Sequence, residues 1–118
     1  MVLAILESFM QKKVEQICIG EYQIIFNLEH NLNICVEGCI EYNNTYFNEN
    51  ETLLAAKKIL ECLGQTITRI SISDDHTLMI SFDNDDSMKF FQHDSFEAYQ
   101  LITTTDHIVC TVDGVEIV

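Results

Sequence analysis

Apolar residues alternate with polar ones over most of this chain, and this period of two constrains the fold more than any other feature. The alternating runs are Val14, Ile17 and Ile19; Tyr22, Ile24, Phe26 and Leu28; Leu32, Ile34 and Val36; Ile67, Ile70 and Ile72; Leu78, Ile80 and Phe82; and Met88 and Phe90. Successive side chains of a strand point to opposite faces, so each run predicts a strand with one buried face. A further short strand is predicted around Cys39 to Tyr42, and the asparagine-rich residues 43–50 are predicted to form a loop.

The spacing of the first three runs recurs in the last three, with a longer first turn in the second set. The chain therefore resembles two three-stranded meanders joined by a helix, either through internal duplication or because alternation is common. At the end of the chain, Asp113-Gly114 separates two apolar runs, Ile108 to Val112 and Val115 to Val118, which predicts a hairpin. We expect one domain, residues 1–118, of the α+β class with a mostly antiparallel sheet.

A helix is predicted over residues 51–63. Its apolar residues recur at spacings of three and four, at Leu53, Leu54, Ala56, Ile59, Leu60 and Leu63. Asn50 is a suitable N-cap, and Gly64 suits the position after the last turn. A shorter helix is predicted at the N-terminus, where Leu3, Leu6, Phe9, Met10 and Val14 follow helical spacing, although that segment is also compatible with a strand.

The net charge is the strongest indication of function. Nineteen acidic residues against six basic ones give a net charge of −13. Such a field repels nucleic acid and anionic lipid and attracts a basic protein, although it also serves solubility. No apolar run approaches the roughly 20 residues of a membrane helix, and the first residues lack the basic segment of a signal peptide. Five cysteines without a C-x-x-C motif, set mostly within apolar runs, predict buried free thiols and a cytoplasmic protein.

Five carboxylates flank one short predicted strand, Leu78 to Phe82. Asp74 and Asp75 precede it, and Asp83, Asp85 and Asp86 follow it. Turns favour aspartate, and successive turns of a meander lie at opposite ends of the sheet, roughly 17–20 Å apart. The five carboxylates are therefore predicted to form two acidic ends and not one site.

The candidate catalytic and metal motifs are all incomplete. Asp83, Asp85, Ser87 and Asp94 match some ligand positions of a calcium loop, but Met88 replaces the glycine that its sharp turn needs. The pairs His107 with Cys110 and Cys35 with Cys39 lack zinc-knuckle spacing. No nucleophile elbow or glycine-rich phosphate loop is present. We predict no metal, no cofactor and no enzymatic activity.

Aromatic residues beside acidic ones supply the candidate binding site. Aromatic side chains anchor protein interfaces while carboxylates steer a basic partner toward them. The predicted partner-binding residues are Asp83, Asp85, Asp86, Phe91, Asp94, Tyr46, Phe47, Asp74 and Asp75. The turn at Asp83 to Asp86 is favoured over the turn at Asp74 and Asp75, because Phe91 and Asp94 follow the former closely in sequence.

Residues 53–118 carry a series of motifs in one order. The series runs Leu60-x-x-Leu63-Gly64-x-x-Ile67, Asp74-Asp75-x-x-Leu78-x-Ile80-x-Phe82-Asp83, Phe96-Glu97-Ala98-x-x-Leu101, and Ile108-Val109-Cys110 with Asp113-Gly114. It resembles an uncharacterised bacterial family of small α+β domains. Tyr99 stands where that family often has tryptophan, and the acidic turn lacks the usual glycine. The motifs are structural, so this resemblance implies a fold and not an activity.

In size, acidity and lack of catalytic motifs, the chain also resembles the immunity proteins of bacterial toxin–immunity systems. Nuclease toxins are basic because they bind nucleic acid, so an acidic inhibitor complements them. The resemblance implies an immunity protein that binds and neutralises a toxin domain. The alternative is a non-catalytic structural or interaction domain, for instance a homodimer formed through a sheet edge.

Overall fold

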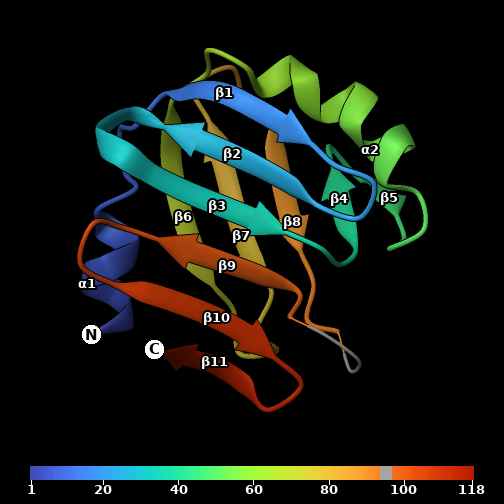
Figure 1. The fold of residues 1–118 in the computed structure, drawn as a ribbon. Coiled ribbons are helices and arrows are strands. Elements are labelled where there is room, and N and C mark those ends of the chain that lie inside the picture. The colour runs from blue at the N-terminus through green and yellow to red at the C-terminus, as the bar shows by residue number, and fades with distance from the viewer. Residues whose placement is uncertain (94–96) are drawn as a thin grey trace.

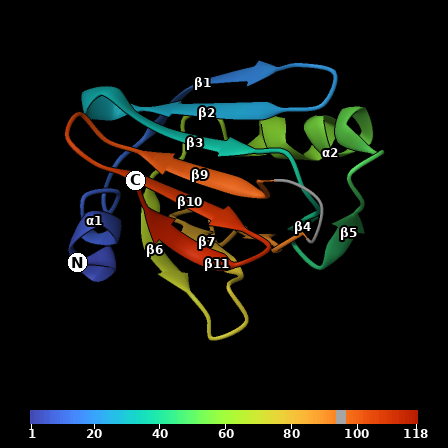
Figure 2. The same ribbon diagram turned by 60° about the horizontal axis from the view of Figure 1, so that its bottom comes forward.

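The computed structural model describes residues 1–93 and 97–118, and these residues form two antiparallel sheets that pack face to face. The larger sheet has the order β1 (Val14–Ile19), β2 (Ile24–Leu28), β3 (Leu32–Val36), β9 (Tyr99–Ile102), β10 (His107–Thr111) and β11 (Gly114–Ile117). The smaller sheet has the order β5 (Thr45–Phe47), β4 (Ile40–Tyr42), β8 (Ser87–Phe90), β7 (Leu78–Phe82) and β6 (Ile67–Ile72). The strands of one sheet run across those of the other (Figure 1), and Figure 2 shows the same two layers from another side.

The predicted alternation is confirmed in the strands that form the core. Strand β2 buries Ile24, Phe26 and Leu28, and strand β7 buries every second residue in the same way. The rings of Phe26 and Phe90 stack between the two sheets with centroids 5.9 Å apart. One hydrophobic core therefore holds both sheets together.

Both predicted three-stranded meanders are present, one in each sheet. Strands β1, β2 and β3 are consecutive neighbours in the larger sheet, and β6, β7 and β8 are consecutive neighbours in the smaller one. Each meander has a register shift at the start of its first strand, at Val14 and at Ile67. The segments that begin the two meanders also bond to each other. The amide of Val14 donates to the Gln65 carbonyl, and the amide of Ile67 donates to the Lys12 carbonyl.

Two short helices complete the fold, as predicted. Helix α1 (Val2–Glu7) lies against β6, and helix α2 (Thr52–Ile59) lies against β4 and β5. Helix α2 continues into the 3-10 turn η2 (Leu60–Cys62), and another such turn, η1 (Glu29–Asn31), joins β2 to β3. Gly64 follows η2 with a φ of +83°, a left-handed conformation that favours glycine. The N-cap is Glu51 and not Asn50 as predicted.

Helix α2 does not bury the side chains that were expected to mark its inner face. It buries Ala55, Ala56, Ile59 and, in η2, Cys62. Four leucines of the predicted stripe are exposed instead, namely Leu53, Leu54, Leu60 and Leu63. Apart from Ile59, the buried face of the helix carries small side chains, and its leucines point outward.

Two strands were not predicted, and they change the arrangement of the meanders. Strand β5 lies within the expected loop, because Asn43 and Asn44 adopt φ values of 47° and 71° and turn the chain back on β4. Strand β9 pairs with both β3 and β10, which joins the C-terminal hairpin to the first meander. The α+β class and the antiparallel pairing are thus confirmed, but the expected arrangement is only partly right.

Candidate protein-binding surface

Asp86 holds two turns of the smaller sheet together. It accepts hydrogen bonds from the Tyr42 hydroxyl at 2.6 Å, from the Asn43 amide at 2.9 Å and from the Asn84 amide at 3.0 Å. The bond from Tyr42 is the main cause of a lowered pKa for the Asp86 carboxyl. This predicted partner-binding residue therefore already has partners inside the chain.

Asp83 is bonded in a similar way, whereas Asp85 is not. The Asp83 Oδ1 accepts from the backbone amide of Thr66 at 3.1 Å, and its own amide donates back to the Thr66 carbonyl. Asp85 is exposed and has a φ of 70° in the tight turn. Of the three predicted acids in this turn, Asp85 has the side chain best placed to meet a partner.

The turn at Asp74 and Asp75 lies at the other end of β7. Both aspartates are exposed, and a hydrogen bond from the Ser73 hydroxyl is the main cause of a lowered pKa for Asp75. The next residue, His76, lies so close to Gly114 that a Cβ on that glycine would come within 3.2 Å of its Nε2. This turn therefore packs against the β10–β11 hairpin of the other sheet.

Two of the predicted aromatic anchors meet in space. The rings of Tyr46 and Phe91 are tilted against each other with centroids 5.8 Å apart. Tyr46 is 54% exposed, Phe91 is half-buried, and Phe47 is half-buried against the core. Asp94, which was predicted to lie beside Phe91, falls outside the described residues.

The expected neighbourhood of Phe91 and the turn at Asp83 to Asp86 is wrong. That turn precedes β8 and Phe91 follows it, so the strand separates them by roughly 15 Å at 3.4 Å per residue. In the register of β7 and β8, Phe90 pairs with Leu78, so Phe91 lies at the end that carries Asp74 and Asp75. Nearness in sequence was misleading because the intervening residues are an extended strand.

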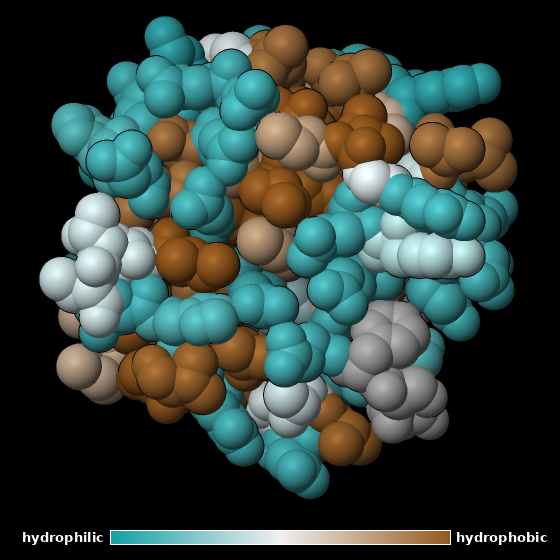
Figure 3. Space-filling view, viewed as in Figure 1, coloured by the Kyte–Doolittle hydropathy of each residue, from teal (hydrophilic) through white to brown (hydrophobic). Residues whose placement is uncertain are grey.

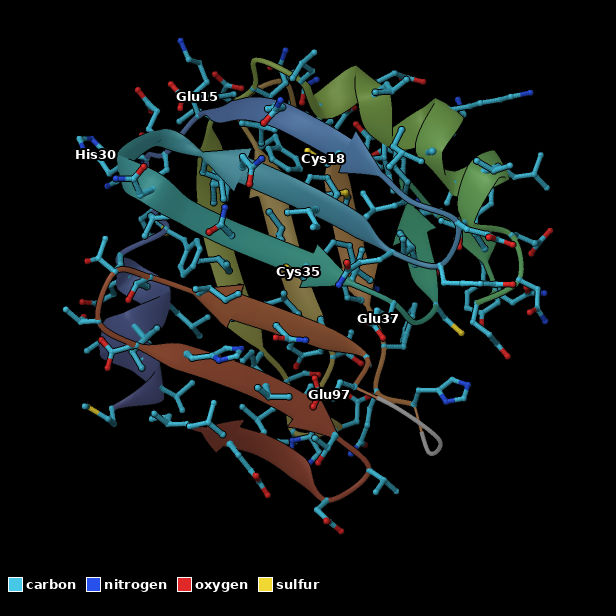
Figure 4. The ribbon with its side chains drawn as sticks, viewed as in Figure 1. Glu15, Cys18, His30, Cys35, Glu37 and Glu97 are labelled. Atoms are coloured by element: carbon cyan, nitrogen blue, oxygen red, sulfur yellow. The ribbon has the colours of Figure 1, made fainter. Side chains whose placement is uncertain are left out.

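A surface that was not predicted lies on the outward side of the larger sheet. Its residues form two rows across β1, β2, β3, β9 and β10, and we call them the outer sheet face. The first row is Cys18, Ile25, Cys35, Gln100 and Val109, and the second is Gln16, Asn27, Asn33, Ile102 and His107. None of the described helices covers this face in Figure 1, and Figure 4 shows Cys35 near its middle, on β3, and Cys18 on the edge strand β1.

The outer sheet face contains no Asp, Glu, Lys or Arg among these ten residues. Its amides bond to one another, to Cys18 and His107, and at its border to the Glu97 carboxylate, which accepts from Gln100 at 2.9 Å. Asn27 donates to the Gln16 Oε1 at 2.8 Å, and Asn33 donates to the Asn27 Oδ1 at 2.5 Å. Gln100 Oε1 lies 2.7 Å from the His107 Nε2. Figure 3 shows hydrophobic side chains in the middle of this view with hydrophilic ones around them.

Carboxylates surround this charge-free area, and we call Glu15, Glu37, Glu97 and Glu116 the acidic rim. Figure 4 shows Glu15 toward one end of β1, Glu37 at the end of β3 and Glu97 just before β9. Glu116 pairs with Val109 on the edge strand β11. The rim thus reaches several sides of a surface whose centre is amide, thiol and aliphatic.

A depression of about 310 Å³ opens at the Glu37 end of the outer sheet face, and Tyr22, Glu37, Glu49 and Asn50 line it. Tyr22 is 70% exposed. The Glu49 carboxylate accepts from the Cys39 thiol at 3.3 Å and lies 3.6 Å from the His93 Nε2. The pKa of Tyr46 is raised to about 12, mainly by Cys39, so this thiol lies near both the depression and the aromatic pair.

Four of the five thiols are buried and therefore poorly placed for nucleophilic chemistry. All five cysteines are free, but Cys18 is exposed, which corrects the expectation that it is buried within its apolar run. Burial is the main cause of raised pKa values for Cys35, Cys39 and Cys110, and it raises the pKa of Cys62 to about 12. The described residues contain no group of three or more His, Cys, Asp or Glu side chains arranged to hold a metal ion.

No family model, curated protein or solved structure matches this chain. The two resemblances drawn from the sequence therefore stay predictions. Among the described residues, no helix has both the length and the apolar character needed to cross a membrane.

Proposed function

We propose that this chain is a non-catalytic binding domain that holds a basic protein on its outer sheet face. We further propose that it acts as an immunity protein and that its partner is a toxin domain. The charge-free centre of the outer sheet face is the observation that carries the proposal. In a chain with 19 acidic residues, ten neighbouring outward positions on five strands carry none of them.

A charge-free centre within a charged surround is the usual anatomy of a protein interface. The core of an interface is depleted in charged residues, and its rim is polar and accessible. An antiparallel sheet that merely faces water normally alternates apolar and strongly polar residues. Amide side chains that already bond to one another, such as Asn27 and Asn33, also lose little water when a partner covers them.

The acidic rim determines the sign of the charge that a partner must carry. Carboxylates that stay in water at the edge of an interface steer association and exclude partners of the same charge. The depression between Tyr22 and Glu37 suits an arginine or lysine side chain of the partner, since an aromatic face and a carboxylate both attract a cation. Glu49 also lines this depression, and the nearby aromatic pair of Tyr46 and Phe91 remains the predicted set of aromatic anchors.

A toxin of the nuclease type is the partner class that fits these features best. Such an enzyme must present cations to bind the phosphate backbone, and a net charge of −13 complements them. Buried thiols with raised pKa values are weak nucleophiles, because the reactive species is the thiolate. These features favour binding over catalysis.

Co-expression with the product of the neighbouring gene tests this proposal. We expect that product to arrest growth when expressed alone, and this chain to restore growth and to purify with it as a one-to-one complex. The Gln16→Lys/Cys18→Lys variant, which places two positive charges on the outer sheet face, should fold and fail to restore growth. A neighbouring product that neither arrests growth nor binds this chain would contradict the immunity proposal.

A further inference from the structure

Helix α2 presents the largest group of exposed leucines among the described residues. Leu53 is 68% exposed, Leu54 52%, Leu60 47% and Leu63 48%. They lie along α2, η2 and the residue that follows, and Figure 3 shows hydrophobic side chains along the edge where α2 runs in Figure 1. This apolar surface is separate from the outer sheet face, because α2 packs on β4 and β5 of the smaller sheet.

Charges on α2 differ from those of the rest of the chain. Lys57 and Lys58 are two of only six basic residues, and both are exposed on this helix. Glu61 lies on the same side, 3.5 Å from Lys58. With Glu51 at the N-cap, two bases meet two acids, so two molecules with a net charge of −13 bring little net charge together at α2.

The order of these residues is self-complementary. Lys57 lies in α2, and Glu61 lies one turn further along in η2, where it pairs with Lys58 of its own chain. When two copies of α2 run antiparallel about a twofold axis at the level of Ile59, Lys57 of each copy faces Glu61 of the other. The same arrangement puts Leu54 of one copy near the level of Leu63 of the other, which follows η2 in extended backbone. A twofold dimer requires this kind of reciprocal match.

We propose that α2 is the interface of a homodimer in which the two helices pack antiparallel. A lipid surface fits less well, because the chain's strong negative charge repels anionic headgroups. The helical segment from Thr52 to Cys62 is only about 16 Å long at 1.5 Å per residue, so the interface is smaller than a standard one of about 800 Å² per partner. The dimer should accordingly be weak and reversible.

Sedimentation velocity with charge-reversal variants tests the pairing directly. In about 0.15 M salt, which screens charges beyond about 8 Å, the mean mass of the wild type should rise from 13.6 kDa toward twice that value between about 10 µM and about 1 mM protein. Lys57→Glu alone and Glu61→Lys alone should each weaken association about tenfold or more, because each places like charges opposite one another twice.

An equimolar mixture of the two variants should restore dimerisation, since positions 57 and 61 then carry opposite charges at both contacts between the unlike chains. Arg69→Glu is the matched control, because Arg69 is exposed on β6, at the opposite edge of the smaller sheet from β5. A wild type that stays monomeric at the highest concentration overturns the proposal. A dimer whose mixed variants associate no better than each variant alone overturns it too, as does a monomer that instead binds anionic phospholipid vesicles.

Discussion

The three hydrogen bonds to Asp86 show how a carboxylate that suggests a binding site in the sequence can serve the fold instead. Asp86 connects the β4–β5 turn, through Asn43, to its own β7–β8 turn. The Tyr42 side chain below it is buried, so the donation of its hydroxyl to Asp86 also satisfies a polar group that would otherwise lack a partner. We therefore expect this residue to affect stability more than binding.

Replacing Asp86 with Asn should lower the free energy of unfolding by about 1–2 kcal/mol at pH 7, in line with the loss of a charged hydrogen-bond acceptor. The folded pKa of Asp86 lies below the ordinary value of 3.8, so its contribution is complete above that pH. It is lost as the pH falls through the folded pKa. Urea unfolding at several pH values measures the difference in free energy of unfolding between wild type and Asp86→Asn. This difference should shrink below pH 3.8. An equal difference at every pH would contradict the prediction.

Thiol accessibility gives a second prediction at the residue scale. A maleimide should label one thiol rapidly in the native protein, that of Cys18, because only Cys18 is exposed. All five should be labelled in denaturant without reductant. Cys18→Ser is the control and should remove the rapid label, and two or more rapid labels in the native wild type would contradict the described burial.

At the scale of elements, the two meanders use the same carboxylate contact. The Glu29 carboxylate accepts from the Lys13 amide at 2.8 Å, and the Asp83 carboxylate accepts from the Thr66 amide at 3.1 Å. Each acid follows the second strand of its meander, and each amide lies just before the first. Lys13 and Thr66 also bridge to each other, so both contacts lie at the junction of the two meanders.

Glu29→Ala and Asp83→Ala should each lower the free energy of unfolding by about 1 kcal/mol, because each leaves a strand-start amide without its acceptor. Asp85→Asn, in the same turn as Asp83, should change it by less than about 0.5 kcal/mol, because Asp85 is exposed and asparagine tolerates its left-handed backbone, with a φ of 70°. Chemical denaturation of the three variants provides the measurement. If Asp83→Ala is as stable as Asp85→Asn, the contact contributes nothing to the fold.

Alternation allowed most strands to be predicted, because a half-buried strand repeats every two residues whatever it pairs with. Helix α2 shows where periodicity fails. Its leucines follow helical spacing, but the face that packs on the sheet carries Ala55, Ala56 and Ile59 instead. Strand β5 was missed because three residues are too few to show a period, and only the Asn43-Asn44 pair indicated its turn.

The binding surface was harder to predict than the fold. Acidic turns were chosen because charge is visible in the sequence, yet Asp83 and Asp86 bond within the chain. The outer sheet face could have been noticed from the polar positions of the alternation, since Gln16, Asn27 and Asn33 are amides and not charged residues. Its extent depends on β9 joining β3 to β10, a pairing between distant segments that no local pattern specifies.

At the scale of the whole molecule, the two sheets differ in what their first strands expose. When the two meanders are aligned at their register shifts, Val14 matches Ile67, and Cys18 on β1 matches Ser71 on β6. Cys18 lies on the outer sheet face, and Ser71 lies on the smaller sheet. Substitution by lysine at these two positions therefore changes the net charge equally but places the new charge on different surfaces.

The affinity of Cys18→Lys and of Ser71→Lys for the product of the neighbouring gene is the most direct test of the proposed binding surface. Titration calorimetry should show Cys18→Lys binding at least about tenfold more weakly than wild type, because a lysine opposes a basic partner within a closed interface. Ser71→Lys should bind within about threefold of wild type, the small effect expected of a charge outside the interface. Equal weakening by both variants, or by neither, would contradict the assignment of the outer sheet face as the binding surface.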